Sequence, residues 1–145
     1  MAGPILHATD FSAASSAAFK QAIETARRDR AELLVVHVMA PPAPLVADAY
    51  MTPAVWDTLL RSQREAAQRQ LDSVVAKARG RVKVRGLLVE GVPADAIVRT
   101  AKARGARMIV MGTHGRRGAA RFFLGSVASR VVAAAHCPVL TVRGR

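Results

Sequence analysis

Glycines in the last third of the chain are spaced as in a loop that binds an anion. Gly112 and Gly115 follow an apolar run from Met108 to Met111, and nine residues separate Gly115 from Gly125-Ser126. Glycine lets the backbone take positive φ and approach a ligand closely. Apolar residues then recur at helical spacing, which predicts a buried strand, a loop, and a helix whose first turn carries the hydroxyl of Ser126.

The start of that helix would offer what a phosphate requires. The first N–H groups of a helix have no partner within it and lie at the positive end of its dipole, so a phosphate can satisfy them. Arg116, Arg117 and Arg121 add positive charge around the loop. Alternatively the glycines only form turns and Ser126 is an N-cap. The strand before the loop and the helix after it favour phosphate binding.

Polar residues also follow the first apolar run of the chain. Pro4 to Ala8 predicts a short strand, in which His7 is expected to pack in the core, and Thr9 and Asp10 come directly after it. Ligands bind at the carboxyl ends of strands in a parallel sheet. Asp10 could therefore meet a ribose hydroxyl or a cation bound to phosphate, although a turn or N-cap aspartate fits the position equally well.

Other segments must form the scaffold around these residues. The expected strands after the first are 32–39, 82–89, 108–111 and 138–142, and helical periodicity separates them. The strand over 32–39 reads as buried on both faces, with Val38 near its end either in the core or against an adenine ring. The strand over 82–89 reads as an edge strand guarded by charges. The longest helix is expected from about Trp56, in the core, to Arg79, with Gly80 as its C-cap.

This alternation of strands and helices predicts a fold class. Parallel β/α units with right-handed crossovers form a doubly wound sheet with helices on both faces. With 145 residues, one domain over 1–145 can bury a core without a disulfide or a structural metal. The single cysteine, Cys137, is expected to be a buried structural thiol. One cysteine and no signal peptide fit the cytoplasm, and no apolar run reaches the ~20 residues of a membrane span.

Positive charge is concentrated in the second half of the chain. Up to Val75 there are 7 Lys and Arg against 8 Asp and Glu, whereas the remainder has 15 against 2, which gives the net charge of +12. This imbalance suits an anionic ligand, loose nucleic-acid binding or simple solubility. Aromatic residues make up only 4%, so stacking on single strands is poorly supported and nucleic-acid binding should be at most non-specific.

The pattern Gly112-x2-Gly115-x9-Gly125-Ser126 resembles the nucleotide-binding signature of the universal stress protein family. Ile5 to Asp10 looks like the family's first strand and its terminal aspartate, so the resemblance covers essentially the whole chain. It implies a five-stranded sheet of order 3-2-1-4-5, with ATP, with or without Mg²⁺, in the cleft between strands 1 and 4. It also places the last strand, Pro138 to Val142, at the sheet edge. An unpaired apolar edge tends to pair, which predicts a homodimer through this strand. Alternatively Pro138, Arg143 and Arg145 keep the edge monomeric.

The resemblance also assigns residues to parts of the nucleotide. Those for adenine and ribose would be Ala8, Thr9, Asp10 and Val38. Those for ribose and phosphates would be Gly112, Gly115, Gly125 and Ser126. Neighbouring positions that would contribute less are Met111, His114, Arg116 and Val127. A slow ATPase or phosphotransferase is the alternative to a regulatory nucleotide binder, but only Asp10 and His114 are available for phosphoryl transfer.

Overall fold

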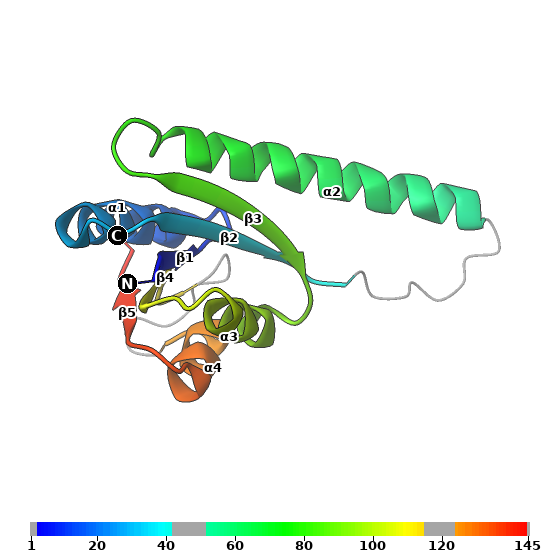
Figure 1. Cartoon of the computed structure of the whole chain (residues 1–145). Coiled ribbons are helices and arrows are strands. Elements are labelled where there is room, and N and C mark those ends of the chain that lie inside the picture. The colour runs from blue at the N-terminus through cyan, green and yellow to red at the C-terminus, as the bar shows by residue number, and fades with distance from the viewer. Residues whose placement is uncertain (1–2, 42–51, 115–123, 145) are drawn as a thin grey trace.

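The protein is described by a computed structural model that covers residues 3–41, 52–114 and 124–144. Strands and helices alternate along these segments (Figure 1). The elements in chain order are β1 (Ile5–Ala8), α1 (Ala13–Asp29), β2 (Leu33–Met39), α2 (Pro53–Ala76), β3 (Val84–Glu90), α3 (Pro93–Ala103), β4 (Met108–Gly112), α4 (Ser126–Ala134) and β5 (Val139–Val142). Within these segments, no helix has the length and apolarity that crossing a membrane requires.

All five strands are parallel and form one sheet of order β3-β2-β1-β4-β5. This confirms the order that the resemblance implied and places β3 and β5 at the two edges. β1 is central, with His7 opposite Val35 of β2 on one side and Val110 of β4 on the other. β2 and β3 lie on one side of β1, and β4 and β5 lie on the other, so the strand order reverses between β1 and β4. The carboxyl ends of β1 and β4 therefore border a crevice that is typical of ligand sites in such sheets.

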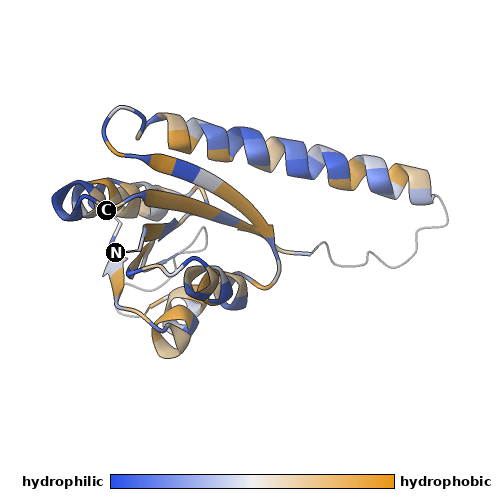
Figure 2. Ribbon diagram, in the orientation of Figure 1, coloured by the Kyte–Doolittle hydropathy of each residue, from blue (hydrophilic) through white to orange (hydrophobic). Residues whose placement is uncertain are grey.

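The helices cover the sheet in two layers, and each layer has its own apolar core (Figures 1 and 2). α1 and α2 pack on one face, where Ile5, Ile23 and Leu71 are almost completely buried. α3 and α4 pack on the other face, where Leu6 and Ile109 are buried. Alternate residues of β1 therefore enter opposite cores, which explains why β1, apart from His7, and most of β2 are apolar.

Local signals in the sequence set the helix ends. Ser12 is the N-cap of α1 and its hydroxyl accepts a hydrogen bond from the Ser15 N–H. Arg30 ends α1 in the left-handed region. Pro93 opens α3, where the missing N–H of proline is not needed, and Gly105 takes a positive φ of 61° just beyond its end.

The longest helix differs from its prediction at both ends. α2 ends at Ala76, before the predicted Arg79, because the next N–H groups bond three residues back and tighten the turn. Gly80 lies beyond it with φ 79° and is not its C-cap. Trp56 is only partly buried, and the side chains of Val55 and Leu59 are 50% and 38% exposed. The prediction of Trp56 in the core is therefore wrong.

The reason is the length of α2. Its 24 residues span about 36 Å, whereas the seven residues of β3 span about 23 Å. The first half of α2 therefore extends past the sheet (Figure 1), and its apolar residues have no sheet beneath them.

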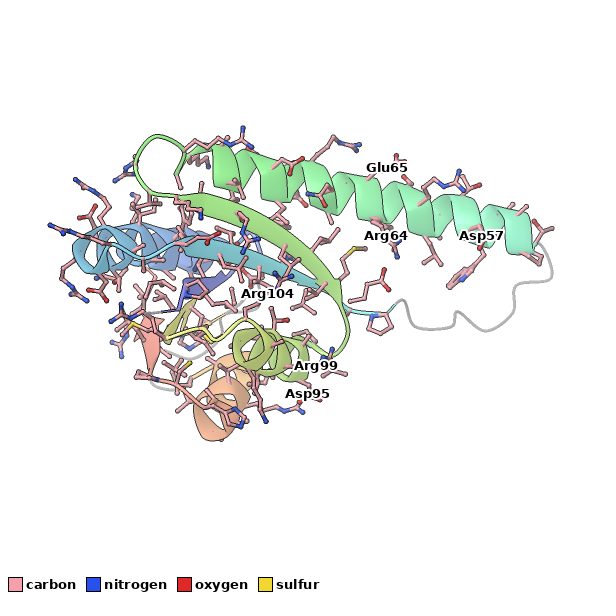
Figure 3. The ribbon with its side chains drawn as sticks, viewed as in Figure 1. Asp57, Arg64, Glu65, Asp95, Arg99 and Arg104 are labelled. Carbon is pink, nitrogen blue, oxygen red and sulfur yellow. The ribbon has the colours of Figure 1, made fainter. Side chains whose placement is uncertain are left out.

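Exposed charged side chains project from α2 and α3, among them Arg64 and Asp95 (Figure 3). Arg64 of α2 pairs with Glu90 at the end of β3, and Arg130 of α4 pairs with Asp95 of α3 at 3.2 Å. All four side chains are more than half exposed, and such pairs contribute at most about 1 kcal/mol each. The positions of α2 and α3 are therefore set by the apolar cores.

Candidate functional site

A cavity of about 390 Å³ lies at the carboxyl ends of the central strands, on the side of α3 and α4. Its walls come from β1, β2 and β4, the turn after β1, and the first turns of α3 and α4. The lining residues that the sequence predicted are Ala8, Thr9, Asp10, Val38, Met111, Gly112, His114, Gly125, Ser126 and Val127. The structure thus brings together every predicted site residue that it describes.

Four residues singled out in the glycine loop lie outside the described segments. They are Gly115, Arg116, Arg117 and Arg121. The two ends of that loop are nevertheless tied together, because the Gly125 N–H donates to the Thr113 carbonyl at 2.6 Å. The loop therefore leaves β4 and enters α4 at one point on the cavity wall.

The first turn of α4 has no side-chain cap. Gly125 occupies the N-cap position, with no side-chain hydrogen bond, and no acidic residue lies in the first turn. Ser126 is the first helical residue, so the alternative in which Ser126 is the N-cap is wrong. The first N–H groups of a helix carry the positive end of its dipole, and Ser126, Val127 and Ala128 all line the cavity.

A network of hydrogen bonds shapes the turn after β1. The Thr9 hydroxyl oxygen accepts from the Phe11 N–H at 3.1 Å and from the Ser15 hydroxyl at 3.0 Å. The Asp10 carboxylate accepts from the Ser12 N–H at 2.9 Å, which is the turn role that its position allowed. Asp10 also lines the cavity, so one carboxylate oxygen holds the turn in place while the residue borders the site.

Two ring side chains that the sequence did not assign lie beside this turn. His37 Nδ1 donates to the Thr9 carbonyl at 2.8 Å, and the His37 ring lies 4.2 Å from the ring of Phe11 with 31° between their planes. Phe11 has a φ of 65°, a left-handed conformation that is unfavourable for an aromatic residue. Such strain often marks functional turns. His37, at the end of β2, also lines the cavity.

Gly112 lies where β4 passes close to α1. A Cβ atom on Gly112 would lie 3.2 Å from both the carbonyl carbon and the oxygen of Ala14. That distance is shorter than an ordinary contact, so the missing side chain makes room for the start of α1. Gly112 therefore serves packing as well as exposing its backbone in the cavity.

Two histidines near the site have a ring nitrogen with no hydrogen-bond partner among the described residues. The His114 Nδ1 is hydrogen bonded to the Thr113 hydroxyl at 2.9 Å, and its buried Nε2 is unpartnered. Buried polar atoms usually have a partner, and His114 lines the cavity. A ligand with polar oxygens could supply the partner that this nitrogen lacks.

His7 lies in the core beneath the site, as predicted. It is fully buried against Phe19, and its Nδ1 donates to the Val110 carbonyl at 3.0 Å. Burial lowers the pKa of His7 to about 4, against the opposing effects of the Val110 hydrogen bond and the Asp10 charge. His7 is therefore neutral at pH 7 and belongs to the scaffold.

Cys137 precedes the edge strand β5 and is partly buried against the core on the α4 side. Burial raises the pKa of its thiol above the usual value, although a backbone hydrogen bond to Ile109 opposes this. A raised pKa disfavours the thiolate, which is the reactive form. These findings fit a structural role.

Among the described residues, no group of three or more His, Cys, Asp and Glu side chains could hold a metal ion. Asp10 is the single carboxylate among the described residues that line the cavity. A divalent cation there would need most of its oxygen ligands from a bound phosphate or from water.

The chain is similar to known proteins over almost its whole length. The model of the Universal stress protein family matches residues 1–143. A universal stress protein of Methanocaldococcus jannaschii, MJ0531, is 40% identical over 139 residues, which cover 93% of this chain and 78% of that protein.

Solved structures share the fold as well. The structure of MJ0577, also from M. jannaschii, has a TM-score of 0.85 at 26% identity and covers 100% of this chain and 98% of that one. A universal stress protein from Archaeoglobus fulgidus, solved in complex with dAMP, has a TM-score of 0.65 at 25% identity and covers 97% of each chain. With the family model spanning residues 1–143, the chain belongs to the universal stress protein family.

Proposed function

We propose that this protein is an ATP-binding regulatory protein that holds the nucleotide between the ends of β1 and β4. The observation that carries the proposal is the first turn of α4, which has no side-chain cap and opens on a cavity with both apolar and polar lining residues. Support also comes from the A. fulgidus relative that was solved with dAMP. An apolar pocket with a few placed polar groups is the usual form of a nucleotide-sized site.

The apolar part of the cavity suits a base. Ala8, Val38, Met111 and Ile97 converge there from three strands and α3. In our proposal adenine lies against these side chains, and Thr9 and Asp10 at the end of β1 lie beside the ribose. Asp10 lines the cavity, and its carboxylate is a hydrogen-bond acceptor of the kind that ribose hydroxyls require.

The phosphates would extend toward the start of α4. There Ser126 offers a hydroxyl, and the N–H groups of the first turn offer donors. The His114 Nε2 has no hydrogen-bond partner among the described residues, and a phosphate oxygen would supply one. Gly115 and Arg116, which fall outside the described segments, would complete the phosphate contacts. Mg²⁺, where it accompanies ATP, would be held chiefly by the phosphates.

The residues of this cavity favour binding over rapid catalysis. Phosphoryl transfer needs a positioned nucleophile and groups that neutralise the developing charge. The only carboxylate among the described lining residues, Asp10, already accepts the Ser12 N–H. We therefore expect any hydrolysis of ATP to be slow.

Calorimetric titration of ATP into the wild type and Gly115→Val tests the proposal. A branched side chain at Gly115 restricts φ and fills space beside the phosphates, so ATP binding should weaken more than tenfold, or by more than about 1.4 kcal/mol. Ala119→Val adds a similar volume at a position outside the spaced glycine motif and should bind like the wild type. Equal affinities for wild type and a folded Gly115→Val protein would defeat the proposal.

A further inference from the structure

A second cavity lies on the opposite face of the sheet, in the groove between α1 and α2. It has a volume of about 420 Å³ and is separate from the proposed nucleotide site. Thr9, which follows β1, and Ser15 of α1 line both cavities and therefore lie between them. A volume of this size is enough to bury a small organic molecule.

The floor of the groove is apolar. Phe19 and Ile23 of α1 contribute from the buried core, and Val74 of α2 and Phe11 contribute partly buried side chains. Phe11 is presented there by its left-handed backbone, with its ring stacked on His37. A ligand that covers this floor would remove apolar surface from water, at about 25 cal/mol per Å².

The rim of the groove is cationic. Lys20 of α1, Lys77 at the end of α2, and Arg81 line it, together with the amide of Gln70. Arg81 is 3.5 Å from Glu24, whereas Lys20 and Lys77 form no ion pair within the part of the chain that the structure describes. No acidic residue is among the described lining residues.

We propose that the groove between α1 and α2 is a second binding site, for a small amphipathic carboxylate whose apolar body covers Phe19, Ile23 and Val74. Its carboxylate would pair with Lys20 of α1 and with Lys77, the C-cap of α2, which both line the groove. The serine hydroxyls of the lining, such as Ser16 and Ser73, can donate to the same oxygens. Charge complementarity at the rim and the apolar floor together select an anion with one apolar end.

Titration of sodium octanoate into the full chain, followed by calorimetry, tests this site. The wild type should bind octanoate saturably, and the neutral analogue 1-octanol should bind at least tenfold more weakly. The double variant Lys20→Gln/Lys77→Gln should weaken octanoate binding at least tenfold and leave ATP binding unchanged. Lys102→Gln, which removes one positive charge from α3 on the opposite face, should bind octanoate like the wild type.

Other results would overturn the proposal. Absence of saturable binding to the folded wild type at millimolar octanoate would do so, as would equal affinity in the wild type and the double variant. If octanol binds as tightly as octanoate, the carboxylate and the lysines contribute nothing to binding, which contradicts the proposal. Octanoate that is displaced by ATP, or weakened by Gly115→Val, would place it in the nucleotide cavity instead. Loss of ATP binding alone would count against the proposed function and leave this second site intact.

Discussion

At the scale of single residues, His7 and His37 lie on neighbouring strands but have different surroundings. His7 lies inside the core with one ring nitrogen bonded to the Val110 carbonyl. His37 lies at the end of β2, where it bonds the Thr9 carbonyl and lines the cavity. The core position of His7 followed from its place within an apolar strand. The role of His37 depends on the left-handed turn at Phe11, which the sequence around Phe11 does not signal.

Because His7 is buried, we predict that the free energy of unfolding depends on pH. The pKa of His7 is about 6.5 in the unfolded chain and about 4 in the folded one, so between these values the unfolded chain binds a proton that the folded chain excludes. The free energy of unfolding should therefore fall as the pH drops from 6.5 toward 4, by up to about 3 kcal/mol from this residue. Above pH 6.5 this contribution should be constant.

Urea denaturation at several pH values between 4 and 7 measures this effect. His7→Leu should be less sensitive to pH than the wild type over that range, whereas His136→Gln, at an exposed position, should have nearly the wild-type dependence. The same pH dependence in His7→Leu and the wild type would contradict the assignment.

At the scale of elements, the sequence predicted the type and order of every helix and strand but was less reliable about how far each is covered. The predicted apolar stripe of α2 runs from Leu71 back to Trp56, yet only the second half of the helix lies on the sheet. Periodicity reports which face of a helix is apolar. It does not report where the neighbouring strand ends, and that is what leaves Trp56 only partly buried.

Two leucines on α2 should therefore differ in their contribution to stability. Leu71 is completely buried and Leu59 is 38% exposed. Leu71→Ala should lower the free energy of unfolding by about 2–5 kcal/mol because it leaves a cavity. Leu59→Ala, the matched control on the same helix, should lower it by less than about 1 kcal/mol. Equal losses in chemical denaturation would show that the first half of α2 is covered in solution.

At the scale of the whole molecule, the sheet order came from the family resemblance, because periodicity alone cannot order parallel strands. The order brings Asp10 and Gly112 to one cavity although they are distant in sequence. It also places β5 at an edge, with β4 as its only partner strand within the described segments. Charged side chains that could guard this edge are absent from β5 itself, and such edges tend to pair.

We predict a two-fold homodimer through antiparallel pairing of β5, since this satisfies the outer backbone groups of both copies. Leu140 packs against the core on the α1 side, so a charge there would disturb folding. Thr141→Lys is the better test and should shift sedimentation at micromolar concentration from dimer toward monomer. Thr58→Lys, on the exposed part of α2, is the control. A monomeric wild type would refute the dimer, and a dimer weakened only by Thr58→Lys would place the interface on α2.

The proposed nucleotide site is tested most directly by following backbone amide resonances of the ¹⁵N-labelled protein while ATP is added. We predict saturable shifts that are largest at the ends of β1 and β4 and in the first turn of α4, including Asp10, Gly112 and Ser126. Amides of α2 that line the second cavity, such as Gln70 and Ser73, should shift little. Saturable shifts centred on the groove between α1 and α2, or no saturable shifts at millimolar ATP, would contradict nucleotide binding between β1 and β4.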